Sequence, residues 1–250
     1  MLRIEHDKKV AILKLDRGIP NPIDLEMVRE LDRALREVKQ NPEIRGLVLS
    51  SANEKIFSLG FNLPVLFPQS RGDFQVFFQA FNRFCLDLYT LPKPTAAALT
   101  GHAVAGGCIL AIPCDLRFIA EGKRSMGLNE VKLGVPVPYV TDRILHRIVG
   151  ARTAREILES GDFYPPPALL EMGLVDRILP AGEVLPQAVE KIAALGALPP
   201  PAFAEIKKNR TEKVVEQILR HREEKDKIFL DLWYAPETRE RLQKAMESFK

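Results

Sequence analysis

The chain has 250 residues, 46% of them hydrophobic and 28% charged, which is typical of a globular protein that buries a full core without disulfide or metal staples. Its 36 basic and 33 acidic residues give a net charge of +3, which argues against a nucleic-acid or membrane partner. The three cysteines and four histidines form no CxxC, HxxxH or HExxH pair, so we expect reduced thiols and no metal chemistry.

The first half of the chain alternates strands with helices. Buried strands are predicted at residues 10–15 and 45–51, where apolar residues run together without alternation. A helix is predicted at residues 23–38, because apolar side chains recur there at steps of three and four. A second helix is predicted at residues 74–91, with phenylalanines along one side, and Pro92 ends it.

Shorter elements follow in the middle of the chain. Strands are predicted at residues 95–99 and 115–120, with a Gly-rich turn and a helix between them. Two more helices are predicted at residues 139–149 and 151–159, and a further strand at 174–179. Strands that alternate with helices indicate an α/β fold with parallel pairing.

A composition change marks a boundary near residue 197. The segment PPPAF at residues 199–203 breaks regular structure, and beyond it the chain is strongly charged and helical. We therefore predict a core at residues 1–197 and a C-terminal region at residues 198–250. Two or three helices of that region are expected to lie on the core or on a neighbouring subunit.

The sequence shows no address to a membrane or an organelle. No apolar run is long enough to span a bilayer, and the start of the chain is neither a signal peptide nor a transit peptide. The final residues, MESFK, are not a peroxisomal signal. A cytoplasmic protein is expected, and a mature mitochondrial form is the open alternative.

Three segments are candidates for chemistry. Residues 57–62 (FSLGFN) and 101–109 (GHAVAGGCI) are Gly-containing turns that follow predicted strands, and residues 127–134 (GLNEVKLG) contain an acid. Unpaired backbone N–H groups from two such turns, converging on one point, would form an oxyanion hole. Taken singly, each turn is better explained as an ordinary strand-to-helix connection.

Glu130 stands in a mostly apolar stretch of the third segment. Desolvation would raise the pKa of its carboxyl from about 4.3 toward the range of about 6–7 that suits a general base. The alternative is a surface glutamate at a helix start, where the helix dipole favours it. The residues alone do not separate these two interpretations.

Taken together and in this order, the segments resemble the crotonase (enoyl-CoA hydratase/isomerase) superfamily. The resemblance begins at DRGIPN (residues 16–21), continues through FSLGFN and AGGCILAIPCDLRFIA (residues 105–120), and reaches GLVDRILP (residues 173–180). It implies a ββα spiral core with a C-terminal helical region, binding of an acyl-coenzyme A thioester, and stabilisation of its enolate.

The resemblance also implies roles for individual residues. Glu130 would be the catalytic base, and the backbone N–H groups of Leu59 and Gly106 would form the oxyanion hole. Lys207, or its neighbour Lys208, would meet a phosphate of coenzyme A, unless this is only a solvated helix face. The other expected substrate-binding residues are Arg17, Pro20, Phe57, Ser58, Phe61, Ile109, Leu133 and Pro136.

One departure from the hydratases suggests the reaction. Hydratases of this superfamily carry two glutamates, but here the first of these positions is Ile109 and only Glu130 remains. The segments GLNEVKLGV and AGGCILA resemble those of Δ3,Δ2-enoyl-CoA isomerases, and PVPYV (residues 136–140) stands where hydratases have PGAGG. We expect an isomerase that converts 3-enoyl-CoA to 2-enoyl-CoA in fatty-acid β-oxidation.

Two alternatives stay open at this point. One is another reaction of the same fold, such as hydration, dehydration or thioester hydrolysis, with Glu130 acting through water. The other is an acyl-CoA-binding protein without activity. The resemblance implies no cofactor beyond the coenzyme A of the substrate, and a homotrimer or a dimer of trimers.

Overall fold

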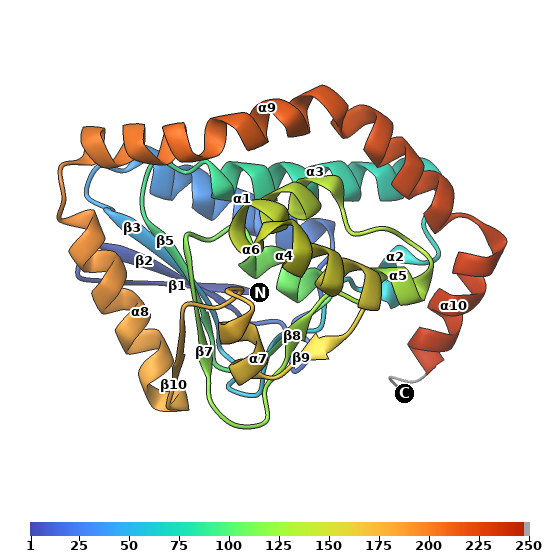
Figure 1. The fold of residues 1–250 in the computed structure, drawn as a ribbon, viewed down its shortest axis with the longest axis horizontal. Coiled ribbons are helices and arrows are strands. Elements are labelled where there is room, and N and C mark those ends of the chain that lie inside the picture. Colours follow the sequence, from blue (N-terminus) through green and yellow to red (C-terminus); the bar gives the residue numbers. More distant parts are fainter. Residues whose placement is uncertain (248–250) are drawn as a thin grey trace.

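A computed structural model of the protein describes residues 1–247. Its main sheet has the strand order β1-β2-β3-β5-β7-β10, in which β1 and β2 form an antiparallel hairpin and all later pairs are parallel (Figure 1). The strands are β1 (Leu2–Asp7), β2 (Val10–Leu15), β3 (Gly46–Ser51), β5 (Thr95–Leu99), β7 (Leu116–Ala120) and β10 (Arg177–Leu179).

Both faces of the main sheet are covered by helices. Along β2, Val10 and Ile12 pack in a cluster with α8 (Ala181–Gly196), while Leu13 and Leu15 belong to the larger cluster that includes α1 (Leu25–Gln40) and α3 (Arg71–Tyr89). Successive side chains of a strand point to opposite faces, so burial on both faces explains why these strands are apolar throughout.

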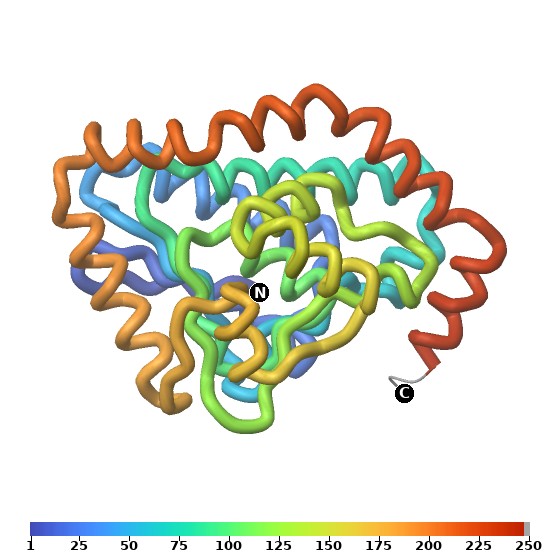
Figure 2. The backbone as a smooth tube through the Cα atoms, in the orientation of Figure 1, coloured from blue at the N-terminus to red at the C-terminus, as the bar shows by residue number. Residues whose placement is uncertain are grey.

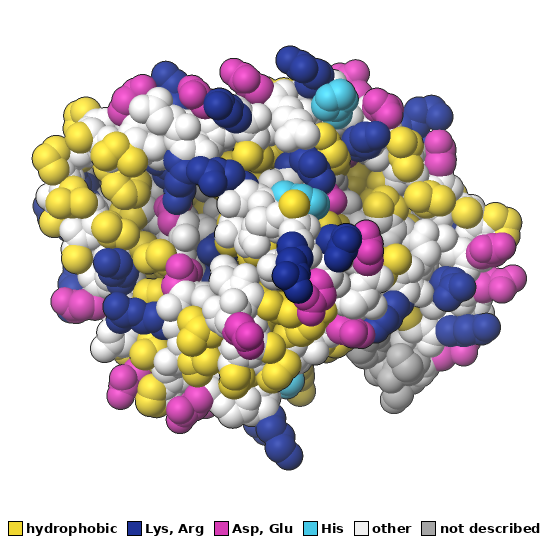
Figure 3. All heavy atoms as spheres, in the orientation of Figure 1, with side chains coloured by type: hydrophobic (Ala, Val, Ile, Leu, Met, Phe, Trp, Pro, Cys, Tyr) yellow, Lys and Arg dark blue, Asp and Glu magenta, His cyan; other side chains and the backbone are white. Residues whose placement is uncertain are grey.

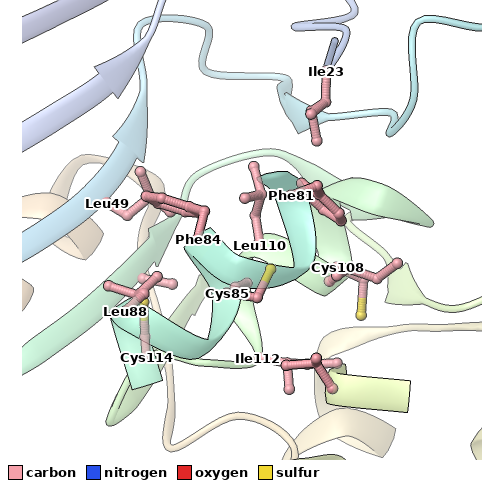
Figure 4. Packing of buried hydrophobic residues seen from close by; sticks show 14 of the residues in the cluster. Ile23, Leu49, Phe81, Phe84, Cys85, Leu88, Cys108, Leu110, Ile112 and Cys114 are labelled. Carbon is pink, nitrogen blue, oxygen red and sulfur yellow. The ribbon is translucent and has the colours of Figure 1, made fainter. Parts of the chain in front are cut away.

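The two helices α1 and α3 begin at side-chain caps. Asp24 accepts a hydrogen bond from the backbone N–H of Met27, and Ser70 accepts one from that of Asp73. The buried face of α3 carries most of its phenylalanines. Figure 4 shows side chains of α3 and of α4 (Gly106–Ala111) lying toward one another in the core.

A second, small sheet lies beside the main one, with the order β4-β6-β8-β9. Its strands are only two or three residues long: β4 (Ile56–Ser58), β6 (His102–Val104), β8 (Met126–Gly127) and β9 (Phe163–Tyr164). The pairs β4/β6 and β6/β8 are parallel, whereas β8/β9 is antiparallel. Strands this short are below the length at which a sequence pattern identifies them.

The C-terminal helices wrap around the rest of the molecule. Helix α9 (Pro200–Trp233) runs along α3 on the upper edge of the view, and α10 (Pro236–Glu247) folds down toward α2 and α5 (Figures 1 and 2). The remaining helices are α2 (Leu63–Leu66), α5 (Glu130–Leu133), α6 (Tyr139–Ser160) and α7 (Pro166–Glu171). Several α9 side chains, among them Ile218 and Trp233, join the main core.

Most elements expected from the sequence are present, with shifted ends. The two helices predicted at 139–149 and 151–159 form α6, which is interrupted at Gly150 by a φ of 77°. The strand predicted at 174–179 is shorter, because the backbone N–H groups of Leu174 and Val175 bond to Leu169 instead of a strand. Strand β1 and helix α8 were not predicted as separate elements.

Side chains of both charges are interspersed on the face shown in Figure 3, with apolar side chains between them. The three cysteines, Cys85, Cys108 and Cys114, are buried and unpaired. Burial raises the pKa of all three thiols. No helix within residues 1–247 is long and apolar enough to span a membrane.

Candidate active site

The small sheet brings the three candidate segments to one edge. Because β4, β6 and β8 run parallel, the residues that follow each strand leave the sheet on the same side. These residues are the Leu59–Asn62 turn after β4, the start of α4 after β6, and the Asn129–Glu130 pair after β8. The topology thus explains how segments far apart in the sequence meet.

Glycines allow the turns after β4 and β6 to touch. A Cβ atom added to Gly107 would lie 2.2 Å from the Ser58 carbonyl oxygen, which no side chain tolerates. A Cβ atom on Gly106 would lie 3.0 Å from the Gly60 Cα and 3.2 Å from the Phe61 nitrogen. The backbone of α4 therefore starts directly against the FSLGFN turn.

Two backbone N–H groups at this contact are free of protein partners. Gly106 is the first residue of α4, so its N–H has no intrahelical acceptor. Around Phe61, the neighbouring bonds join Ile23 to the Gly60 oxygen and Asn62 to the Ile23 oxygen, so the Phe61 N–H points to the opposite side. Within the described residues, neither N–H donates a hydrogen bond.

Leu59 does not supply one of these donors. Its backbone N–H donates to the Pro20 carbonyl oxygen at 2.9 Å, which leaves it unavailable to a substrate oxygen and corrects the expectation for this residue. The free N–H of this turn belongs to Phe61, two residues further along. The sequence could not show this, because the bridge between Ile23 and Phe61 that orients the turn is not local.

The backbone is strained where α4 begins. Ala105, the residue before Gly106, has a φ of 48° and a ψ of −125°, a conformation that residues with a side chain rarely adopt. Such strain tends to occur at functional sites, where the surrounding structure enforces it. Here it places the start of a short, fully buried helix against the FSLGFN turn.

Glu130 is a buried acid without a counter-charge. Its side chain is 7% exposed, and its Oε2 atom has no hydrogen-bond partner among the described residues. Burial raises the pKa of Glu130 to about 7, although its own backbone N–H acts in the opposite direction. A carboxyl whose pKa is raised in this way suits proton transfer near neutral pH.

The free N–H groups and Glu130 open onto one cavity of about 610 Å³, a size that suits a small-molecule ligand. Its lining is mainly apolar and includes Ile109 and Leu133. Another part of its lining comes from the far end of the same chain, namely Phe229 and Trp233 of α9 and Leu242, Ala245 and Met246 of α10.

The sequence profile of the enoyl-CoA hydratase/isomerase family matches residues 5–250. The chain belongs to this family. The mitochondrial enoyl-CoA delta isomerase 1 of Homo sapiens is 31% identical over 191 residues, which is 76% of this chain and 63% of the human protein. A putative enoyl-CoA hydratase of Thermus thermophilus is 34% identical over 191 residues, 75% of this chain and 74% of that protein.

The fold agrees with this family. The crystal structure of human mitochondrial delta3-delta2-enoyl-CoA isomerase superposes with a TM-score of 0.95 at 27% identity, over 99% of this chain and 97% of that one. The α/β crotonase fold with C-terminal helices that the sequence predicts is therefore confirmed. The chain is an enzyme of the enoyl-CoA hydratase/isomerase family.

In this enoyl-CoA hydratase/isomerase family member, some of the predicted binding residues line the cavity and others do not. Pro20, Phe61, Ile109 and Leu133 do, together with Leu59, Gly106 and Glu130. The remaining predicted residues, Arg17, Phe57, Ser58, Pro136 and Lys207, lie outside the lining.

Three of these residues support the turns instead. Phe57 is fully buried behind the FSLGFN turn. The Ser58 hydroxyl donates to the Asn21 carbonyl oxygen and accepts from the Gly60 N–H, which ties the two loops together. The Arg17 guanidinium pairs with Asp24 at 2.5 Å. Pro136, in contrast, is exposed.

Lys207 lies far from the cavity. It stands in the third turn of α9, whereas Trp233 is 26 residues further on, about 39 Å along the helix axis. Its Nζ atom is buried and donates to Asp115 at 2.7 Å and to the Lys93 carbonyl oxygen at 3.1 Å. Both partners are on the core, so Lys207 fastens α9 to the main sheet.

Sequence reasoning missed the wall formed by α9 and α10. Helix α10 is held by the Thr238 hydroxyl, which donates to the Gly134 oxygen at 3.1 Å, and by Arg239, which donates to the Phe67 oxygen at 2.7 Å. The Arg239 guanidinium also lies 3.4 Å from the centre of the Phe67 ring. The one available signal was the helical spacing of Leu242, Ala245 and Met246 in a charged segment.

Proposed function

We propose that this protein isomerises 3-enoyl-CoA to 2-enoyl-CoA as a step of fatty-acid β-oxidation. The observation that carries the proposal is a single carboxylate, Glu130, buried without a partner in an apolar cavity beside two free backbone N–H groups. The similarity to a human enoyl-CoA delta isomerase supports the same reaction.

The first step is removal of a proton from the substrate. The thioester oxygen accepts hydrogen bonds from the N–H groups of Phe61 and Gly106. The ionised Glu130 takes a proton from C2, and the electron pair of the broken C–H bond delocalises over C2, C4 and the thioester oxygen as a dienolate. Removing one oxyanion donor generally costs about 2.7–4 kcal/mol of transition-state stabilisation.

The second step returns the same proton to a different carbon. Neutral Glu130 protonates C4, the electron pair shifts to form the C2–C3 double bond, and the carboxylate is regenerated. No atom is gained or lost overall. One carboxylate serves both steps because its pKa of about 7 makes it a competent base and a competent acid.

Ile109 supports isomerisation over hydration. Its side chain lines the cavity and cannot orient a water molecule, whereas water addition needs groups that position and activate water. An apolar side chain also keeps water away from the dienolate and from Glu130.

We also propose that coenzyme A enters only as part of the substrate and that no other cofactor takes part, because a proton shift requires neither an electron acceptor nor an activated water. The described residues contain no group of three or more histidine, cysteine or acidic side chains that could hold a metal ion. A homotrimer or a dimer of trimers stays a prediction from the resemblance, and a cytoplasmic or mitochondrial location stays a prediction from the sequence.

The decisive experiment uses 3-hexenoyl-CoA. Purified protein is expected to give a conjugated enoyl thioester, seen by ultraviolet absorbance, without a change in mass. The variant Glu130→Gln should lose about 10²–10⁴-fold in kcat, the usual contribution of general acid–base catalysis. The variant Glu156→Gln, which changes an exposed glutamate on α6, is the matched control and should behave as the wild type.

Each other outcome identifies a different function. A product heavier by one water molecule would mean hydration, and release of free coenzyme A would mean hydrolysis. Binding of acyl-CoA without any turnover would mean that the protein is a binder.

A further inference from the structure

One wall of the cavity is aromatic and comes from two elements. The rings of Phe61, Phe229 and Trp233 face the cavity, the first from the FSLGFN turn and the other two from α9. The Phe61 and Trp233 rings meet edge to face, with centroids 6.4 Å apart. This wall lies next to the reacting centre, because the Phe61 backbone carries one of the two free N–H groups.

A second layer of rings on α3 backs each ring of the wall. Trp233 stacks on Phe74 with centroids 4.2 Å apart, and Phe229 stacks on Phe78 at 4.0 Å. The second layer is fully buried, and Trp233 itself is only 2% exposed. Stacked, close-packed rings without space behind them do not move aside for a ligand.

The ring of Phe61 is held in the same way. It meets the rings of Phe77 and Phe81 edge to face, with centroids 4.9 Å and 5.1 Å apart. The wall is therefore a rigid end to the cavity. The part of the lining that α10 supplies is different, because Leu242 and Met246 are flexible aliphatic side chains.

We propose that Trp233, together with Phe229, ends the channel for the acyl chain and sets an upper limit on its length. The proposal rests on the proposed function, since it takes the ligand of this cavity to be an acyl-CoA. An alkyl tail is the ligand that such a wall accepts, because the wall offers apolar ring faces. The substrates are therefore short- and medium-chain acyl thioesters, and a long straight chain does not fit.

Trp233 is the only tryptophan of the chain, so its fluorescence reports on the wall directly. Wild-type protein is titrated with saturated acyl-CoA thioesters, which bind but cannot isomerise. Butyryl-CoA is expected to bind, by calorimetry, with little change in emission. Octanoyl-CoA is expected to change the emission, because its tail reaches the ring.

The affinity for acyl-CoA thioesters, measured against the length of the acyl chain, gives the upper limit on that length. Each methylene that becomes buried is expected to improve affinity about fourfold. In the wild type this improvement should stop at a medium chain length, and hexadecanoyl-CoA should bind no better. In Trp233→Leu, which removes the ring, the improvement should continue for at least two further methylenes, whereas Leu232→Ala, on the exposed face of α9, should leave the limit unchanged.

Two further variants guard against a folding defect. Trp233→Phe keeps a ring in the stack and should hold the limit near the wild-type length. If Trp233→Leu does not fold, Phe229→Leu opens the same wall and should move the limit in the same direction.

Different results would contradict the chain-length limit and the isomerase activity. Affinity that rises steadily to hexadecanoyl-CoA in the wild type, or a limit that stays fixed in folded Trp233→Leu or Phe229→Leu, overturns the inference alone. If no acyl-CoA binds at any length, the inference and the proposed function both fall.

Discussion

Position 106 has two structural requirements, and glycine is the residue type that meets both. Its N–H must stay free at the start of α4, and its Cα must lie against the FSLGFN turn, where a Cβ atom would come within 3.0 Å of the Gly60 Cα. Both demands concern the backbone, so a minimal side chain is enough to disturb them.

The variant Gly106→Ala is expected to keep the fold and to lose about 10²–10³-fold in kcat, because the added methyl group pushes the two donor segments apart. The measurement is kcat with 3-hexenoyl-CoA alongside a thermal melt. Gly182→Ala, at a helix position with no atom within 4 Å, is the matched control. Equal losses in the two variants would contradict a local role for Gly106.

The pKa of Glu130 predicts how activity depends on pH. Burial places this pKa at about 7, and the base must be ionised to take the proton from C2. The value of kcat/KM should therefore rise between about pH 5 and about pH 8, with an apparent pKa near 7. A profile that is flat over this range, with substrate binding unchanged, would rule out Glu130 as the base.

Helix α10 connects two elements that carry the site. Thr238 contacts Gly134 at the end of α5, and Arg239 contacts Phe67 at the end of α2. A hydrogen bond from a charged donor and a cation–π contact each contribute on the order of 1–2 kcal/mol.

Replacing Arg239 with Ala is expected to loosen α10, to raise KM several-fold, and to leave the melting temperature nearly unchanged. Hydrogen exchange of the α10 amides, together with KM for 3-hexenoyl-CoA, measures both effects. Arg241→Ala, which removes only a 3.5 Å contact to Lys132, is the control. A large fall in the melting temperature would mean that Arg239 serves the whole fold rather than α10.

At the start of α9 the expected effect is on stability. Burial raises the pKa of Asp115, but the Lys207 and Arg210 cations outweigh it and hold this pKa below its ordinary value. Lys207→Met leaves the buried carboxylate with one partner fewer, so we expect a loss of about 3 kcal/mol in the free energy of unfolding. Denaturant titration measures this loss.

The same variant separates two roles for Lys207. If it fastens α9, the affinity for free coenzyme A, measured by calorimetry, should not change. A loss of affinity in a protein of unchanged stability would restore the phosphate contact suggested by the resemblance. Lys208→Met, at an exposed neighbour, completes the comparison.

The sequence predicted the large elements well, because long apolar periods such as those of α1 and α3 are local. It could not place Phe61 correctly, since the free N–H of that turn depends on a bridge to Ile23, 38 residues earlier. It could not show that α10 lines the cavity either, because the local sequence of a charged helix does not indicate which surface the helix covers. The sequence also could not show that Lys207 is buried, because a buried lysine and a solvated one look alike in a charged segment.

For the whole molecule, buried acids make stability depend on pH. In the folded protein, burial raises the pKa of Glu130 from its ordinary value of 4.5 to about 7 and that of Asp226 from 3.8 to about 6. The folded state thus binds more protons than the unfolded state over this range. Its stability should therefore fall as pH rises, which is opposite to the usual behaviour of paired carboxylates.

We expect Glu130 alone to lower the free energy of unfolding by about 3 kcal/mol as pH rises from its unfolded to its folded pKa. Denaturant titrations between about pH 5 and about pH 8 measure this slope. Glu130→Gln should flatten the slope and be more stable than the wild type at the alkaline end. A variant as pH-dependent as the wild type would contradict the assignment.

Helix α9 links two distant parts of the molecule. Its base is fixed to the main sheet by Lys207 and Asp115, and its tip carries Trp233, about 39 Å away along the axis. By simple geometry, a tilt of one degree at the start of α9 would displace its end by roughly 0.7 Å. Functional groups generally have to be held within about 0.5 Å of their productive positions. If the base of α9 shifts when this ion pair is removed, we therefore expect the packing of α9 on α3 to take up the movement before it reaches Trp233.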